Sequence, residues 1–371
     1  MSDSEFEEKI DWVRLNLING LGPRLRRELL TRFQSPAAIL QASKNELMVV
    51  PGIGNHLAES IVHSNNRLEA VAELEKSRRH GFEVLAEYEI RYPKSLLQIP
   101  DPPGVLSMHG ELLETDCLAI AIVGTRHASR YGLAQTQKLA FGLSQAGFTI
   151  VSGLARGVDT AAHEAALEAG GRTIAVLGSG LLHLYPPENK NLAARIAESG
   201  AVLSEYGIEH KPKSSTFPQR NRIITGLSLG VIVIEASQRS GALISARHAV
   251  EQDREVFAVP GRVDSRTSTG CHALIREGAK LVECIDDVIE ELGPLAEKIT
   301  NEAGQEVQHP AELQLNEQER AVLGAVDDDT VSIDSIVHRT KLPVSRVLST
   351  LSVLEMKRLI HRVSGTRVSR S

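Results

Sequence analysis

Residues 118–153 read LAIAIVGTRHASRYGLAQTQKLAFGLSQAGFTIVSG, and this stretch decides which fold we expect. It contains an apolar run, a loop with Gly and Arg, an amphipathic segment and a second apolar run. Near-continuous runs of Val, Ile and Leu are typical of strands in a parallel sheet that is covered on both faces. The order strand, helix, strand therefore indicates an α/β fold.

Similar apolar runs recur along the chain with amphipathic segments between them. They read TIAVLG, AVLSEY, GVIVIEA, EVFAVPG and AKLVEC. This regular alternation predicts an extended Rossmann-like, doubly wound parallel sheet over about residues 81–293. The Pro-rich front of this segment, YPKSLLQIPDPPGVLSMHG, is expected to add an irregular arm or an edge strand.

Smaller units are expected on both sides of the sheet. Residues 1–80 read as short helices around two similar turns, NGLGPR and PGIGNH, and resemble a SAM-like or helix-hairpin-helix unit. These turns either hold nucleic-acid backbone or simply close a helical bundle, and both interpretations stay open. Residues 294–314 lack apolar periodicity and are expected to be a linker. Residues 315–371 predict three helices and a basic β-ribbon, which is the pattern of a winged helix.

The composition supports a folded chain and limits its partners. The chain has 371 residues, and 42% of them are hydrophobic, which suits roughly two or three domains with real cores. A formal net charge of -6 excludes a uniformly basic surface, so a polyanion would have to meet a local cluster of Arg and Lys. Cys117, Cys271 and Cys284 lack CxxC spacing, which favours reduced, mostly buried thiols and no metal site.

Nothing in the sequence predicts export or a membrane span. The first residues, MSDSEFEEKIDW, are acidic and lack the apolar core of a signal peptide. No stretch reaches the about 20 apolar residues that a membrane span requires. We therefore expect a cytoplasmic protein.

The loops that follow the predicted strands carry residues suited to binding phosphate. The carboxyl ends of parallel strands lie at one edge of a sheet, so these loops are expected to converge. Glycine lets backbone N–H groups approach an anion, and arginine supplies a bidentate fork. Each loop alone is also typical of an ordinary strand-to-helix turn. The candidates are Gly124, Arg126, Ser129, Ser152, Gly153, Gly157, Gly178, Gly180, Arg220, Asn221, Arg222, Ser240 and Gly241.

The stretch FPQRNRIITG, residues 217–226, places two of these arginines at the predicted start of a helix. Arginine there opposes the helix dipole, and a bound anion would relieve the mismatch. We expect Arg126, Arg220 and Arg222 to be exposed and to hold consecutive phosphates, while Asn221 fixes the loop or a base edge. The alternative is that these are solvated or salt-bridged surface arginines. Asp159 and His163 are expected either to serve this site or only to cap and pair on their own helix.

The ordered set of loop motifs resembles the DNA-processing protein A (DprA/Smf) family. The resemblance covers about residues 92–292 and rests on GTRHASRYG, SGLARGVDTAAH, GSGLLHLYPPEN, LSEYG, FPQRNRIITGLS, EASQRSGALISARHA, FAVPG and CHALIREGAKLV. It implies a non-catalytic protein without cofactor or metal that binds single-stranded DNA. It also implies homodimers that help load RecA recombinase on incoming strands during natural transformation.

The resemblance also assigns particular residues. Arg126 takes the place of the family's arginine after the first strand, and residues 220–222 match its RNR motif. Pro187 stands where many members have a lysine, and Lys190 is the candidate to reach the same phosphate. The open edge strand AKLVEC and the resemblance together imply a homodimer. Its expected contacts are His272, Ile275 and Leu281.

Other functions of the same fold fit less well. Phosphoribohydrolases carry PGGxGTxxE, whereas this chain has SQRSGALISARHAVE without the double glycine and the placed glutamate. A dinucleotide oxidoreductase needs GxGxxG with an acidic residue about 20 positions on, and a P-loop enzyme needs GxxxxGK[ST]; neither pattern is present. Because only 4% of residues are aromatic, no base-stacking platform is expected, and binding should depend on phosphates and on salt. Whether the winged helix binds duplex DNA or a protein stays open.

Overall fold

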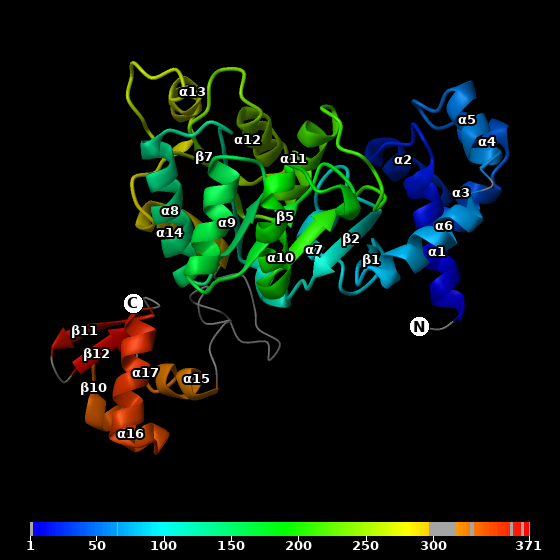
Figure 1. Cartoon of the computed structure of the whole chain (residues 1–371). Helices are drawn as coiled ribbons and strands as arrows, with labels where there is room; N and C mark the ends of the chain where they lie inside the picture. Colours follow the sequence, from blue (N-terminus) through cyan, green and yellow to red (C-terminus); the bar gives the residue numbers. More distant parts are fainter. Residues whose placement is uncertain are drawn as a thin grey trace.

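The computed structural model describes residues 3–64, 66–296, 317–326, 330–356, 359–364 and 367–370. Its centre is a nine-stranded sheet in the order β1-β2-β6-β5-β4-β3-β7-β8-β9 (Figure 1). The strands from β3 onward in this sheet pair in parallel, and β1 and β2 add antiparallel strands at one end. The predicted doubly wound fold is therefore confirmed. The strands are β1 (Glu83–Ala86), β2 (Val105–Gly110), β3 (Ala119–Gly124), β4 (Thr149–Ser152), β5 (Thr173–Val176), β6 (Ala201–Ser204), β7 (Gly230–Ile234), β8 (Glu255–Ala258) and β9 (Lys280–Leu281).

Helices cover both faces of this sheet. One face carries α8 (Arg130–Gln145), α9 (Val158–Glu168), α10 (Lys190–Ser199) and α14 (Asp286–Ala296). The opposite face carries α7 (Lys94–Leu97), α11 (Thr216–Gly226), α12 (Ala242–Glu251) and α13 (Thr269–Arg276). Three short 3₁₀ turns complete this part of the chain: η1 (Glu114–Cys117), η2 (Leu181–His183) and η3 (Pro187–Asn189).

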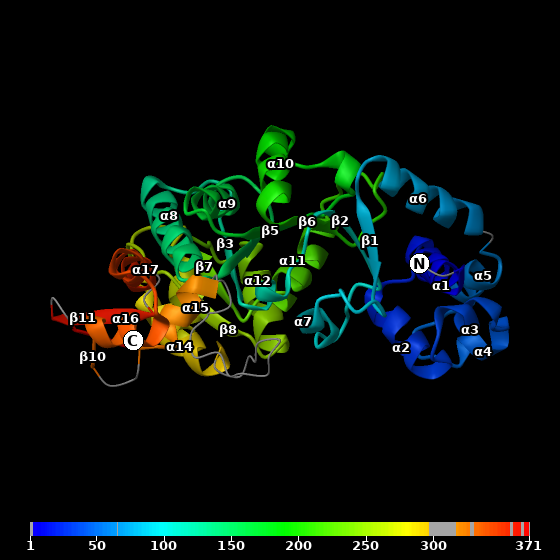
Figure 2. The same cartoon turned by 90° about the horizontal axis from the view of Figure 1, so that it is seen from below.

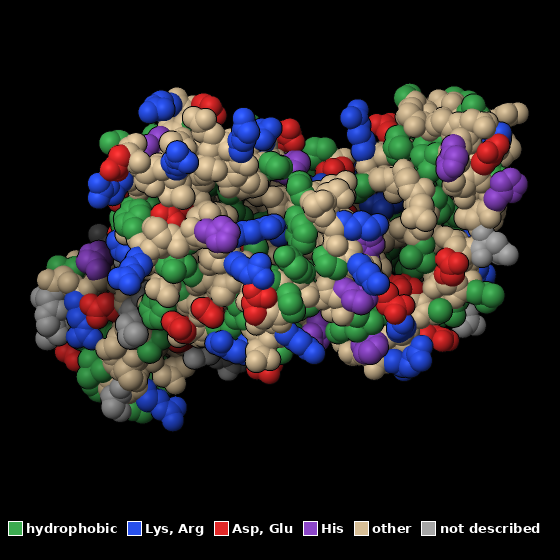
Figure 3. Space-filling model, turned by 45° about the horizontal axis from the view of Figure 1, so that its top comes forward, with side chains coloured by type: hydrophobic (Ala, Val, Ile, Leu, Met, Phe, Trp, Pro, Cys, Tyr) green, Lys and Arg blue, Asp and Glu red, His purple; other side chains and the backbone are tan. Residues whose placement is uncertain are grey.

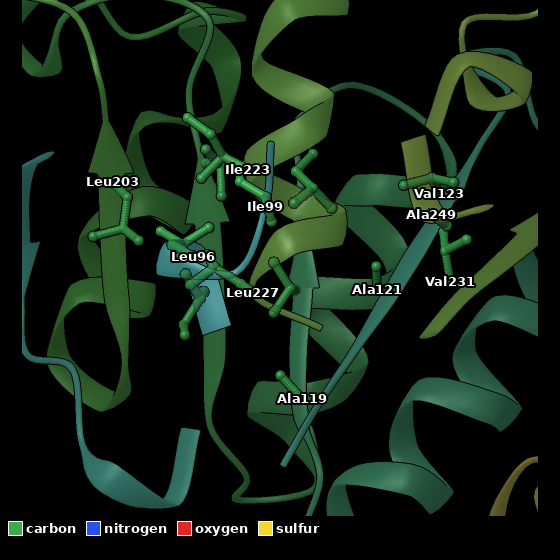
Figure 4. Packing of buried hydrophobic residues seen from close by; sticks show 14 of the residues in the cluster. Leu96, Ile99, Ala119, Ala121, Val123, Leu203, Ile223, Leu227, Val231 and Ala249 are labelled. Atoms are coloured by element: carbon green, nitrogen blue, oxygen red, sulfur yellow. The ribbon is translucent and has the colours of Figure 1, made fainter. Parts of the chain in front are cut away.

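The two-residue period of the strands divides the core between these faces. On β3, Ala119 and Ala121 face α11, while Ile120 and Ile122 face α8 and α9. In the same cluster, Figure 4 shows Leu227 between Leu96 and the small alanines of β3. Full burial of each large apolar side chain contributes about 1.5–3 kcal/mol, so both layers are needed to hold the sheet.

The N-terminal helices form their own apolar cluster and lie beyond the β1 end of the sheet (Figures 1 and 2). Their two predicted turns have matching backbones: Gly20 and Gly52 have φ of +85° and +89°, which favours glycine. Each turn ends in an extended glycine that precedes a helix. The SAM-like, helix-hairpin-helix expectation is therefore confirmed. The helices are α1 (Asp3–Leu17), α2 (Pro23–Phe33), α3 (Pro36–Gln41), α4 (Lys44–Met48), α5 (Asn55–Val62) and α6 (Arg67–Arg79).

The C-terminal part has the predicted winged-helix fold. Its small sheet has the order β10-β12-β11, and Ile336, Leu351 and Val368 belong to one buried apolar cluster beneath it. The expected linker at 294–314 begins inside α14, which continues to Ala296, and the rest of it lies outside the described residues. The elements are α15 (Glu317–Leu323), β10 (Val331–Ser332), α16 (Ile333–Thr340), α17 (Val344–Met356), β11 (Ile360–Ser364) and β12 (Arg367–Arg370).

Two further expectations concern cysteines and membranes. Cys271 is buried, but Cys117 is exposed and Cys284 is half-buried, so the expectation of mostly buried thiols is wrong. Among the described residues, every helix is too short or too polar to cross a bilayer.

Candidate nucleic-acid interface

The loops that follow β3, β4 and β5 meet the first turns of α11 in one pocket. It lies at the carboxyl edge, which is the edge of the sheet formed by the carboxyl ends of its parallel strands, close to the point where the strand order reverses between β3 and β7. We call it the edge pocket. Its lining residues are Arg126, Gly153, Ala155, Arg156, Tyr185, Pro186, Phe217 and Arg220.

Two arginine and aromatic pairs surround this pocket. The Arg126 Cζ atom lies 5.4 Å from the centre of the Phe217 ring, and the Arg156 Cζ atom lies 5.9 Å from the centre of the Tyr185 ring. The two rings are 5.6 Å apart, and Arg156 also pairs with Glu188. Tyr185 lies in the loop after β5 and Phe217 in the first turn of α11, so the two rings lie together although the overall aromatic content is low. The expectation that binding depends on phosphates stays a prediction.

Arg220 forms the buried side of the pocket. Its side chain is only 4% exposed, and its Nη1 atom donates to the carbonyl oxygens of Gly153, at 2.7 Å, and Val176. Burial lowers the pKa of Arg220 to about 10, while Asp159 opposes this shift and Arg126 adds to it. The guanidinium therefore keeps its charge at neutral pH.

Arg222 points away from the pocket. Its Nε atom lies 3.2 Å from Asp101 Oδ2, its Nη2 atom donates to Glu205, and the residue is 3% exposed. The expectation that Arg220 and Arg222 are both exposed is therefore wrong. Helix α11 begins at Thr216, so both arginines lie inside the helix, where a separation of two residues turns them about 200° apart.

The other residues of this motif and the first loop have described positions too. Arg126 is exposed, as expected. Asn221 Nδ2 donates to the carbonyl oxygen of Gly241 at 3.3 Å, which ties α11 to the loop after β7. In that loop, Ser240 Oγ accepts a hydrogen bond from the Ala242 N–H at 3.2 Å. Asn221 thus fixes the loop, which was one of the two roles expected for it.

Two predicted serines, Ser152 at the end of β4 and Ser129 in the loop after β3, form hydrogen bonds within the protein. Ser152 Oγ donates to the Ile122 carbonyl oxygen at 2.6 Å, and Ser129 bonds to the carboxylate of Glu235. Lys190 is exposed at the start of α10 and is not among the residues lining the edge pocket. These side chains lie at the expected edge, but the structure does not bring them all to one pocket.

Four of the predicted glycines allow neighbouring segments to approach closely. A Cβ at Gly178 would lie 2.8 Å from the Phe217 ring, and one at Gly180 would lie 2.5 Å from the backbone of Ile208. A Cβ at Gly124 would overlap the carbonyl oxygen of Ile234. Gly157, with φ of +75°, lies against the loop after β3. These glycines bring the edge loops together, and Gly153 is the one that lines the pocket.

Asp159 and His163 are buried beside the pocket. Asp159 Oδ2 accepts a hydrogen bond from the Ala155 N–H at 3.2 Å, so it holds the loop before α9 and does not cap that helix, whose N-cap residue Gly157 has no side-chain hydrogen bond. His163 does not pair with it, because its Nδ1 atom bonds to Thr173 Oγ1 at 2.7 Å. Burial, with a smaller effect from Arg220, lowers the pKa of His163 to about 3.

The three residues expected in a dimer contact differ in exposure. His272 Nε2 lies 3.0 Å from the Gly261 carbonyl oxygen, and Ile275 packs against the main core. Leu281 is 40% exposed on β9, which is the end strand of the sheet as the sequence predicted. Of the three, Leu281 is therefore the side chain most available to a partner.

Charge on the molecule is local. Lys and Arg side chains are spread over the face seen in Figure 3, with apolar and acidic side chains among them. A polyanion would therefore be held at particular positions such as the edge pocket, and not by a continuous basic surface.

Comparison with known proteins agrees with this architecture. A family model described as DNA recombination-mediator protein A matches residues 83–293. Models described as a DprA winged helix domain and as a SAM-like helix-hairpin-helix tandem match residues 306–366 and 14–64. Together the three matches account for the sheet, for the helices before it and for the winged helix after it.

Similar proteins cover most of the chain. Protein Smf of Synechocystis sp. is 35% identical over 98% of this chain and 99% of its own length. The X-ray structure of DNA processing protein A from Streptococcus pneumoniae is 37% identical with a TM-score of 0.67, and covers 76% of this chain and 97% of that one. A Helicobacter pylori DNA processing protein A, whose structure describes a single-stranded DNA binding mode, is 34% identical with a TM-score of 0.52, over 57% of this chain and 95% of that one. The chain therefore belongs to the DNA recombination-mediator protein A family, which includes the proteins named DprA and Smf.

Proposed function

We propose that this protein binds single-stranded DNA at the edge pocket, protects it, and helps load RecA recombinase on it during natural transformation. The observation that carries the proposal is the pocket lining, which holds three arginines, two aromatic rings and no carboxylate. Such a set suits a flexible strand, because cations hold phosphates and rings stack on bases of any sequence.

The arginines of the pocket differ in how they would act on a strand. Arg126 is exposed and can form charge-assisted bonds with a phosphate directly. Arg220 is fixed by the Gly153 and Val176 carbonyl oxygens, so its charge is already positioned before a ligand arrives. A fixed charge in a partly dry site attracts an anion more strongly than the same charge in water. The pocket is thus suited to one phosphate together with an adjoining base.

The rest of the proposal depends on the family. The Helicobacter pylori relative is described as binding single-stranded DNA, and its structure covers 57% of this chain. We extend to this chain the homodimer, the RecA partner and a cytoplasmic location. The same extension treats the protein as non-catalytic. The winged helix is assigned either to duplex DNA or to a protein partner, and the edge pocket is expected to bind strands without it.

The test compares ligands on the full chain. Fluorescence anisotropy is measured with labelled oligo(dT), with a duplex of the same length and with a labelled mononucleotide. We expect tight binding of the single strand and weaker binding of the duplex. Chromatography of the mononucleotide after incubation should show no released base. Preference for the duplex would contradict the proposal. Hydrolysis of the mononucleotide would favour the alternative, a nucleotide-binding enzyme related to phosphoribohydrolases. A RecA strand-exchange assay on the bound strand then tests the mediator role.

A further inference from the structure

Glu235 places a buried carboxylate beside the loop that follows β3. It comes directly after β7, is 6% exposed and has φ of +51°, a value that is uncommon outside glycine. Its Oε2 atom accepts a hydrogen bond from the Ser129 backbone N–H at 2.7 Å, and its Oε1 atom accepts one from Ser129 Oγ at 2.5 Å. Thr267 Oγ1 donates to Oε1 at 3.4 Å, so the carboxylate joins three loops.

This carboxylate lies at the N-terminus of α8, a helix of 16 residues with no acidic residue in its first turn. A Cβ at Gly132, in that first turn, would lie 2.6 Å from Glu235 Cδ, so the carboxylate is packed directly against the helix backbone. The helix follows β3 and Glu235 follows β7, the two strands between which the strand order reverses. In doubly wound folds, nucleotide phosphates bind at this position because free N–H groups and the helix dipole favour an anion there.

We propose that Glu235 is a resident anion that fills the phosphate position of the fold and thereby keeps free nucleotides out. The Glu235 carboxylate accepts the hydrogen bonds of the Ser129 N–H and of the Ser129 and Thr267 hydroxyls, and it lies at the positive end of the helix dipole. A nucleotide phosphate would need the same groups. Phosphates of a bound strand are then left to the edge pocket, where Arg126 and Arg220 lie. Glu235 thus makes the protein bind a DNA strand in preference to a free nucleotide. The exclusion of nucleotides at the N-terminus of α8 holds whatever the edge pocket binds, whereas the preference for a strand rests on the proposed function.

The variant Glu235→Ala tests this inference, because the change removes a fragment about the size of acetate and leaves the Ser129 N–H and hydroxyl without their partner. Thermal melting of the full chain is measured in sodium acetate, in sodium phosphate and in sodium chloride of equal ionic strength. We expect the variant to melt below the wild type in chloride and to be restored, in a saturable manner, by acetate or phosphate. The wild type and the control Glu251→Ala, which alters an exposed glutamate, should show only the general, non-saturable stabilisation by kosmotropic salts, and to the same extent.

Equilibrium dialysis with ADP measures nucleotide exclusion directly. We expect Glu235→Ala to bind ADP about tenfold or more tightly than the wild type, since the phosphate can then occupy the helix N-terminus that the carboxylate fills. Glu235→Gln, whose amide still fills the space, should bind ADP no more tightly than the wild type does. ADP binding by the wild type as tight as that of Glu235→Ala would overturn the inference. If Glu235→Ala does not fold in chloride, refolding in acetate is the readout, and failure of acetate and phosphate to restore it overturns the inference as well.

Discussion

Arg222 and Glu205 form a buried ion pair that joins α11 to the segment after β6. The same guanidinium lies 3.2 Å from Asp101, and the Glu205 carbonyl oxygen accepts a hydrogen bond from Asn16 of α1 at 2.9 Å. The pair therefore belongs to the contact between the sheet and the N-terminal helices. Its neighbour Arg220 instead lines the edge pocket, so the two arginines of one short motif have different tasks.

The first prediction follows from this ion pair. Arg222→Ala should lower the free energy of unfolding by about 3–5 kcal/mol, because it leaves the buried Glu205 carboxylate without its partner. Urea unfolding followed by circular dichroism measures the change. Arg222→Met combined with Glu205→Gln should recover part of the loss, because the buried Glu205 charge is then removed and Asp101 is partly exposed to solvent. If the free energy of unfolding of Arg222→Ala equals that of the wild type, the ion pair does not stabilise the fold.

Much of the fold could be predicted from the sequence because burial leaves a simple pattern. The runs AIAIVG and GVIVI have no polar side chain, which is typical of strands covered on both faces, and both are strands of the parallel sheet. Strand order and layer assignment then follow from the fold class.

The side-chain arrangement of the site could be predicted only in part. The loops were placed correctly, since strand ends determine them, but the direction of Arg222 depends on where α11 begins, and a shift of a few residues rotates a helix face. The pairing of Tyr185 with Phe217 joins segments more than 30 residues apart, and a single sequence carries no periodic signal for it. Glu235 was missed because an acidic residue after a strand gives no sign of which helix end it meets.

A second prediction concerns the contact between Gly153 and Arg220. A Cβ at Gly153 would lie 2.5 Å from Arg220 Nη1, and that guanidinium is anchored by two carbonyl oxygens and cannot withdraw easily. Gly153→Ala should therefore cost about 1–3 kcal/mol of stability through overpacking and should weaken strand binding. Gly241→Ala is the stability control, because its Cβ would enter open space. Equal melting of the two variants would contradict this reading of the pocket.

The third prediction is a pH dependence of stability that arises from His163. Its pKa in the folded state, about 3, lies below the ordinary value of 6.5, so the folded protein binds fewer protons than the unfolded chain in acid. The stabilisation is complete above about pH 6.5 and falls as the pH drops toward 3, by up to ~1.4 kcal/mol per pH unit. His163→Asn retains a donor near Thr173 but removes the titration. Unfolding free energies at pH 7 and pH 5 should therefore differ by roughly 2 kcal/mol less in the variant. An identical pH dependence in both proteins would rule out this role.

The fourth prediction concerns assembly through β9. An open edge strand with an exposed leucine is a natural surface for a second copy, so Leu281→Lys should convert a dimer into single chains that keep the circular dichroism spectrum of the folded wild type. Light scattering after size-exclusion chromatography measures the mass. Leu68→Lys, at a more exposed leucine of α6, is the matched control and should remain dimeric. A wild type that is already a single chain at micromolar concentration would refute the proposed dimer.

The fifth prediction isolates the exposed cation of the edge pocket. Arg126 lies over the Phe217 ring, so Arg126→Ala removes a phosphate contact and leaves the buried layers intact. Loss of one charge-assisted contact costs ~1.5–3 kcal/mol, which weakens oligo(dT) binding by about 10- to 150-fold. The slope of log affinity against log salt should also fall by about 0.7, since one fewer phosphate is neutralised. Arg195→Ala, an exposed arginine that lines a separate hollow with Leu167 and Gly171, is the matched control and should change neither quantity. Equal losses in both variants would mean that binding follows net charge alone, and an unchanged salt slope in Arg126→Ala would remove Arg126 from the site.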